Sequence, residues 1–128
     1  MIYPDFISQR PDFGYFWLMF FKDVIGQEEV KKRLIRSVQE QRISHAQLFT
    51  GHEGTGKLAL ALAFARFVSC RNRGAADSCG ECPSCRKYQK LIHPDLHFAF
   101  PVFPTKQYQK PVSDDFIHRW REMILKNP

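Results

Sequence analysis

Apolar residues recur at helical spacing in three stretches of the sequence. From 27 to 42 they lie three or four positions apart among basic residues, which predicts an amphipathic helix with one buried face. From 57 to 70, Ala, Leu and Phe fill almost every position, which predicts a helix buried on most sides. After Ser113, two aspartates and then regularly spaced apolar residues predict a third helix that begins there.

Two short apolar runs are typical of strands. Residues 46–50 form one run, which ends at Gly51, and residues 97–102 alternate loosely around phenylalanines before Pro104. Together with the helices, these runs predict an α/β fold. We expect a parallel sheet that begins with the strand 46–50, is flanked by helices and carries a cysteine insert on one side.

Residues 1–18 differ in character from the rest of the chain. The apolar run 15–21 is shorter than the ~20 residues that a membrane-spanning helix needs. No small-residue cleavage site follows it, as a secretory signal would require. Because organised pattern begins directly after Met19, we expect residues 1–18 to be an extension that can be removed without loss of folding. Residues 19–128 would then be the folded part.

Composition narrows the class of protein. Of 128 residues, 44% are hydrophobic and 25% are charged, which excludes collagen-like, low-complexity and many-helix membrane proteins. The net charge of +6 makes a polyanion a reasonable partner. All four cysteines fall between positions 70 and 85, which favours metal binding over a disulfide-stapled secreted fold. Reduced thiols and the lack of a convincing targeting segment predict a cytoplasmic location.

A glycine-rich loop lies between the predicted strand 46–50 and the predicted helix 57–70. Residues 51–58 read Gly-His-Glu-Gly-Thr-Gly-Lys-Leu, which matches the phosphate-loop pattern G-x-x-x-x-G-K without its closing Ser or Thr. The glycines let backbone N–H groups approach phosphate oxygens. Leu58 cannot coordinate Mg²⁺, so we expect a nucleotide-binding ancestry without efficient hydrolysis. The candidate nucleotide-binding residues in this loop are Gly51, Gly54, Thr55, Gly56 and Lys57.

The cysteines form a second candidate site, with the spacing Cys70-x8-Cys79-x2-Cys82-x2-Cys85. Each C-x2-C pair can place two thiolates on one ion, and tetrahedral Zn²⁺ takes four ligands. We therefore predict a closed structural zinc site that staples residues 70–85. Three alternatives stay open: ligation by Cys82, Cys85, His93 and His97, an iron–sulfur cluster, and four free thiols.

Several of these features occur in one order along the chain. Residues 21–27 read Phe-Lys-Asp-Val-Ile-Gly-Gln, residues 44–51 read Ser-His-Ala-Gln-Leu-Phe-Thr-Gly, and the loop 54–57 and the cysteine insert follow, with His-Pro-Asp at 93–95. This order resembles the N-terminal AAA+ domain of bacterial DNA polymerase III clamp-loader subunits. The resemblance covers about residues 20–104.

The resemblance implies roles for individual residues. Val24, Ile25, Gly26 and Gln27 would line the adenine side of a nucleotide cleft. Gly54, Gly56 and Lys57 would face the phosphates, and the cysteines Cys70, Cys79, Cys82 and Cys85 would hold zinc.

Within this family, gamma/tau subunits carry Thr after the loop lysine, whereas delta-prime subunits commonly have degenerate loops and hydrolyse no ATP. Leu58 therefore favours a delta-prime-like subunit that assists sliding-clamp loading in DNA replication, without a catalytic residue of its own. The resemblance implies other clamp-loader subunits (gamma/tau and delta) as partners, and the sliding clamp and primer–template DNA as partners through the complex. ATP binding is left open.

Two other functions stay open. The chain could be a gamma/tau-like subunit that hydrolyses ATP in spite of Leu58. It could also be a zinc-stapled module that binds DNA through Lys31, Lys32, Arg33 and Arg36. Because no apolar strand that ends in an acidic pair precedes Pro128, we expect the sequence to be an N-terminal fragment without the Walker B motif.

Overall fold

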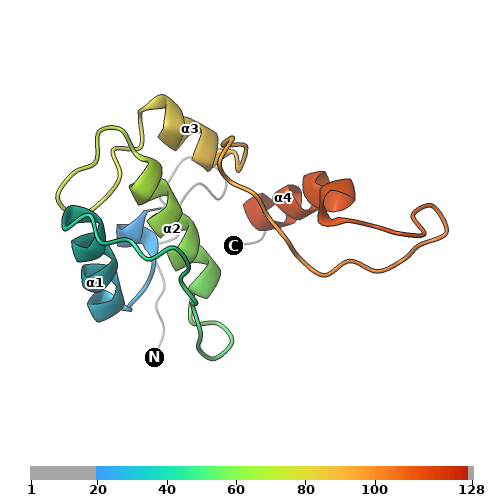
Figure 1. The fold of residues 1–128 in the computed structure, drawn as a ribbon, viewed down its shortest axis with the longest axis horizontal. Helices are drawn as coiled ribbons and strands as arrows, with labels where there is room; N and C mark the ends of the chain where they lie inside the picture. The colour runs from blue at the N-terminus through green and yellow to red at the C-terminus, as the bar shows by residue number, and fades with distance from the viewer. Residues whose placement is uncertain (1–19, 127–128) are drawn as a thin grey trace, which may run out of the picture.

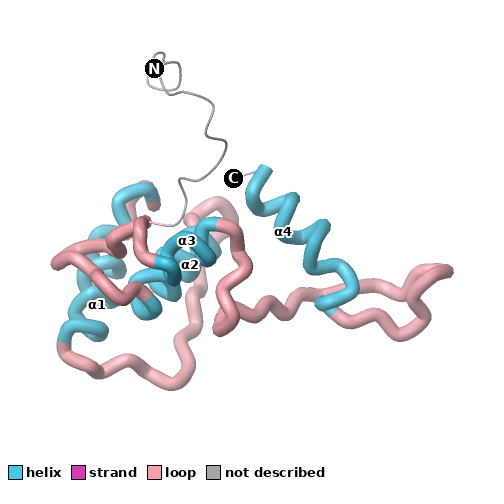
Figure 2. The backbone as a smooth tube through the Cα atoms, turned by 90° about the horizontal axis from the view of Figure 1, so that it is seen from above, coloured by secondary structure: helices cyan, strands magenta, loops and turns pink. Residues whose placement is uncertain are grey.

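The computed structural model describes residues 20–126, and within this range the chain consists of helices joined by loops (Figure 2). The α-helices are α1 (Glu28–Gln39), α2 (Lys57–Ser69), α3 (Pro83–Gln89) and α4 (Ile117–Lys126). Two short 3-10 helices, η2 (Phe21–Asp23) and η3 (Ser113–Phe116), precede α1 and α4. The helices predicted at 27–42, at 57–70 and after Ser113 are confirmed.

The prediction of an α/β fold with a parallel sheet is wrong for the described part of the chain. Residues 46–50 and 97–102 run through loops, and no strand occurs between residues 20 and 126. An extended segment becomes a strand only when a second segment accepts and donates its backbone hydrogen bonds. Residues 43–50 have no such neighbour within the described range, and Leu48 remains 88% exposed.

The first apolar cluster joins α1, α2 and η2, which lie together in Figure 1. Leu34 and Val38 come from the inner face of α1, and Leu60 and Phe67 come from α2. The ring of Phe21 in η2 packs edge-on against Phe67, with 5.5 Å between the ring centroids. This cluster holds the N-terminal segment against the helix that begins at the glycine-rich loop.

A second apolar cluster covers another face of α2. Leu62 of α2 meets Tyr88 of α3 and the fully buried Leu91, and residues of α4 pack against this group. Trp120 of α4 also packs against Phe98 at a tilt of 43°, with 4.2 Å between the ring centroids. Because α2 contributes to both clusters, it is buried on most sides, as its continuous apolar sequence predicted.

The segment that leads into α4 is anchored at one point. The hydroxyl of Ser113 accepts a hydrogen bond from the N–H of Phe100 and donates one to its carbonyl, at 3.1 and 3.0 Å. Asp115 accepts a bond from the N–H of Val112 in the first turn of η3. The two aspartates at 114 and 115 therefore begin a helix, as the sequence indicated, and do not follow a strand.

Two further predictions concern the ends of the chain and membranes. The expected extension 1–18 lies outside the described residues. Among residues 20–126, every helix is too short or too polar to cross a membrane.

Candidate metal centre and glycine-rich loop

The four cysteines meet at the junction of α2 and α3. Cys70 caps the C-terminal end of α2, Cys82 is the N-cap of α3, and Cys85 lies in the first turn of α3. Cys79 comes from the loop between the two helices. All four Sγ atoms lie within 4.8 Å of one another. The spacing of the cysteines predicted this cluster, and the fold brings all four together.

Backbone N–H groups surround the sulfurs and change their acidity. The N–H groups of Cys79, Cys82 and Cys85 each point to the sulfur of a preceding cysteine at 3.4 Å. Burial opposes ionisation of Cys82, but N–H donors from Cys85 and Arg71 outweigh it and lower its pKa to about 6. Hydrogen bonds from Cys82 and Glu81 lower the pKa of Cys79. Burial instead raises the pKa of Cys70 to about 12.

This geometry fits a tetrahedral thiolate site. Zn–S bonds of about 2.3 Å place the sulfurs of a tetrahedral centre about 3.8 Å apart. The Sγ atoms of Cys70 and Cys79 are 3.5 Å apart, and those of Cys79 and Cys85 are 3.9 Å apart. The four thiols can therefore hold a metal ion, in agreement with structural zinc. The group consists of cysteines alone, because His93 Nε2 contacts Ser84 instead.

The glycine-rich loop curls around the side chain of Lys57, the first residue of α2. The ammonium group donates to the carbonyls of Gly51 and His52, at 2.9 and 2.5 Å. Gly54 and Gly56 have φ angles of 76° and 73°, in the left-handed region that side chains disfavour. The hydroxyl of Thr55 closes the turn by donating to the His52 carbonyl. The loop thus places a positive charge at the start of a helix, where the helix dipole also favours anions.

The residues expected on the adenine side separate into two groups. Val24 is buried, and its Cγ1 lies 3.7 Å from the position of a Cβ built on Gly56, so it supports the loop directly. Ile25 is 96% exposed. Gly26 and Gln27 both have positive φ, and Gln27 lines the neighbouring pocket.

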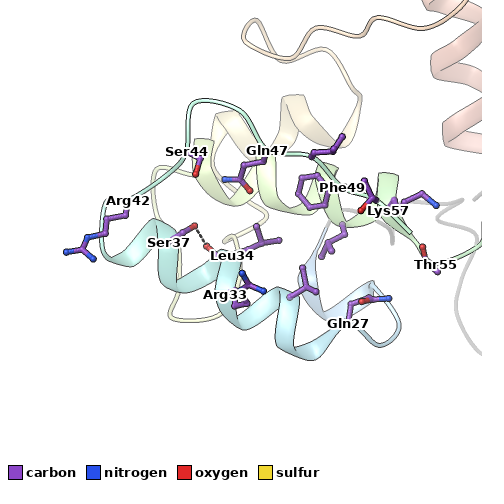
Figure 3. A pocket seen from close by; sticks show the side chains of 14 residues that line it. Gln27, Arg33, Leu34, Ser37, Arg42, Ser44, Gln47, Phe49, Thr55 and Lys57 are labelled. Carbon is purple, nitrogen blue, oxygen red and sulfur yellow. Dashed lines mark hydrogen bonds between the residues drawn. The ribbon is translucent and has the colours of Figure 1, made fainter. Parts of the chain in front are cut away.

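A pocket of about 570 Å³ lies between α1, the segment 42–50 and the start of α2 (Figure 3). Its lining includes the cationic residues Arg33, Arg42 and Lys57 and no acidic residue. Thr55 and Lys57 are shared with the predicted nucleotide-binding residues. Arg33 and Arg42 were missed as pocket residues. Helical periodicity places Arg33 on the basic face of α1, and Arg42 lies beyond the helix end, but periodicity does not show which segment covers them.

Lys31 also differs from expectation. It was grouped with solvated basic residues that could contact DNA, but it is 6% exposed. Its ammonium group donates to the carbonyl of Val24 at 2.5 Å and pairs with Glu28 at 2.8 Å. Lys31 therefore fixes the start of α1 against the segment before it, and its charge is satisfied inside the fold.

Comparison with known proteins identifies the family to which the chain belongs. The chain belongs to the family described as DNA polymerase III, delta subunit, whose model matches residues 26–128. The expected relationship to a clamp-loader-type subunit is confirmed.

Individual relatives include more than one kind of subunit. The chain is 43% identical over 75 residues to DNA polymerase III subunit delta' of Bacillus subtilis, which covers 59% of this chain and 22% of the relative. It is 41% identical over 66 residues to subunit tau of the same organism, covering 52% of this chain and 12% of the relative. It is 37% identical over 76 residues to subunit tau/gamma of Haemophilus influenzae, covering 59% and 11%. The chain thus spans under a quarter of these relatives. No solved structure matches it.

Proposed function

We propose that this protein is a delta-prime-like subunit of a DNA polymerase III clamp loader that does not hydrolyse ATP. The observation that carries the proposal is Leu58, which follows the loop lysine and has no oxygen to offer a magnesium ion. Phosphoryl transfer in such loops depends on a hydroxyl-bound Mg²⁺ that neutralises charge on the phosphates. Leu58 is 45% exposed at the start of α2. Lys57 and the N-terminus of α2 support anion binding, but the chemistry of the loop does not support turnover.

The cysteine cluster would serve this subunit as a structural zinc site. Four protein ligands leave no open coordination position for water or substrate. The ion would join the end of α2 to the start of α3, and so would make residues 70–85 a zinc module. Lowered pKa values at Cys79 and Cys82 favour the thiolate form that a metal requires.

The partners of the subunit follow from its proposed class. It would assemble with the other clamp-loader subunits, gamma/tau and delta, and would meet the sliding clamp and primer–template DNA through the complex. The match to a delta' relative and to tau and tau/gamma relatives supports membership of such an assembly.

A second candidate function is that of a gamma/tau-like subunit that hydrolyses ATP. The identities of 41% and 37% to tau and tau/gamma proteins favour it. Under this alternative Lys57 would bind the β- and γ-phosphates during turnover, and another group would replace the missing hydroxyl.

Two measurements on the full-length protein distinguish the two candidates. We expect no Mg²⁺-dependent ATP hydrolysis above background by the isolated subunit, and robust hydrolysis would overturn the proposal. In a reconstituted clamp loader, we expect K57A in this subunit to leave the ATPase rate unchanged, whereas omission of the subunit should lower clamp loading. A loss of ATPase activity in the K57A complex would instead favour the gamma/tau-like function.

A further inference from the structure

His93 lies four residues after the end of α3. Its side chain is 11% exposed and makes two hydrogen bonds. Nε2 lies 3.1 Å from the hydroxyl of Ser84, which is itself buried in the first turn of α3. Nδ1 accepts a bond of 3.2 Å from the backbone N–H of Asp95. The ring is therefore held at both nitrogens, without contact to a cysteine sulfur.

The hydrogen bond from the backbone N–H of Asp95 determines which nitrogen of His93 carries the proton. A backbone N–H can only donate, so Nδ1 must be the unprotonated nitrogen, and Nε2 must carry the hydrogen. His93 therefore donates to Ser84. This direction is opposite to that of a catalytic serine–histidine pair, in which the histidine removes the serine proton. The carboxylate of Asp95 lies 4.0 Å from Nδ1, beyond hydrogen-bond distance. The arrangement consequently has a structural role and does not activate Ser84.

His93 contacts α3 at two points, Ser84 and Tyr88, and Tyr88 in turn connects α3 to the end of α2. The imidazole packs against Tyr88 at a tilt of 33°, with 4.6 Å between ring centroids, and the Tyr88 hydroxyl lies 2.9 Å from that of Ser69. Ser69 directly precedes Cys70 at the end of α2. Ser84 directly precedes Cys85 in α3. Each of these two serines is thus the neighbour of a buried candidate ligand.

We propose that His93 is a positioning residue that holds Cys70 and Cys85 at the separation a metal ion requires. This inference rests on the proposed zinc site. By bracing α3 at Ser84 and at Tyr88, whose hydroxyl lies beside that of Ser69 at the end of α2, His93 preorganises the thiols before the ion arrives. Residues that orient ligands in this way commonly contribute about 10- to 100-fold to metal affinity.

The test is a Co²⁺ and Zn²⁺ titration of the complete 128-residue chain, followed by the absorption of the Co²⁺–thiolate complex. We expect H93A and H93N to bind metal about 10- to 100-fold more weakly than the wild type. H93Q can still donate an N–H to Ser84, and we expect it to restore most of the affinity. D95A keeps the backbone N–H that contacts Nδ1 and should bind like the wild type.

Two further readouts separate positioning from a general loss of structure. Nitrogen-15 spectra of the imidazole should show the proton on Nε2, and the S84A variant should remove the benefit of H93Q over H93N. Far-ultraviolet circular dichroism identifies any unfolded variant. If H93A is unfolded, the metal affinities of H93Q and H93N are compared instead to test the positioning role. Wild-type affinity and an unchanged cobalt spectrum in H93A and H93N would overturn the positioning role of His93 but would leave the zinc site standing. Failure of the wild-type chain to bind either metal would overturn the zinc site as well.

Discussion

The cysteine region (residues 70–85) and the glycine-loop region (residues 43–58) lie at opposite ends of α2. They are organised differently. In the cysteine region, the end of α2, a loop and α3 exchange N–H···S bonds, and two of the four thiols are buried. In the glycine-loop region, residues 43–50 exchange no backbone hydrogen bonds within the described range. The first region shows that nearby residues can build a whole site. The second shows that an extended apolar segment needs a neighbour before it becomes a strand.

We expect the largest effect from a substitution that removes one of the cysteines. C85A removes a fully buried thiol from the proposed site, and we expect it to abolish zinc binding. Because metal binding free energy is also folding free energy at such sites, its loss should lower the free energy of unfolding by more than about 3 kcal/mol. Elemental analysis and thermal unfolding measure the two effects. Wild-type protein treated with a strong chelator is the control, since it should unfold like C85A. Unchanged stability in both samples would contradict a structural metal.

The second prediction compares the two regions through one apolar residue from each. F67A truncates a ring that is fully buried between α2 and η2, and it should cost about 3–5 kcal/mol. L48A removes a side chain that is 88% exposed, and it should change stability by less than about 0.5 kcal/mol. Denaturant unfolding measures both. A large loss in L48A would show that residues 43–50 are packed in solution.

Local patterns in the sequence were sufficient to predict several parts of the structure. The spacing of Val30, Leu34 and Val38 predicted α1, and the cysteine spacing predicted the cluster, because both depend on residues a few positions apart. The strand at 46–50 was wrong because an apolar run contains no information about its pairing partner. The roles of Lys31 and His93 were missed because each depends on a contact with a residue that periodicity does not relate to it.

The third prediction compares two glycines with positive φ, Gly80 beside the cysteines and Gly26 before α1. At Gly80 the φ is 80°, and a Cβ would lie 2.8 Å from Cζ of Phe20. At Gly26 the φ is 71°, but among the described residues nothing beyond its two chain neighbours lies within 4 Å of the added carbon. G26A should therefore cost about 1 kcal/mol for backbone strain alone, and G80A should cost about 2 kcal/mol because Phe20 must also move. Equal losses in thermal unfolding would show that Phe20 moves freely.

The smallest expected effect concerns a carboxylate at the edge of the first apolar cluster. Asp23 has one buried oxygen without a hydrogen-bond partner, and burial raises its pKa above 3.8. A folded-state pKa above the unfolded value means that the ionised form destabilises the fold, so this cost appears as pH rises and is absent at low pH. D23N should therefore raise stability slightly at pH 7, by less than about 0.5 kcal/mol because the side chain is only partly buried.

The comparison for D23N is Asp77 in the cysteine region, whose negative charge also raises the pKa of Asp23. Its carboxylate accepts hydrogen bonds from the N–H groups of Lys22 and Ser78, at 3.1 and 2.9 Å. Since Asn offers only one oxygen for these two donors, D77N should lower stability at pH 7, opposite in sign to D23N. Thermal unfolding at pH 7 and at a pH below the Asp range measures both variants. If D23N also destabilised the protein, the Asp23 carboxylate would have a favourable partner in solution, and burial would not dominate at this edge of the core.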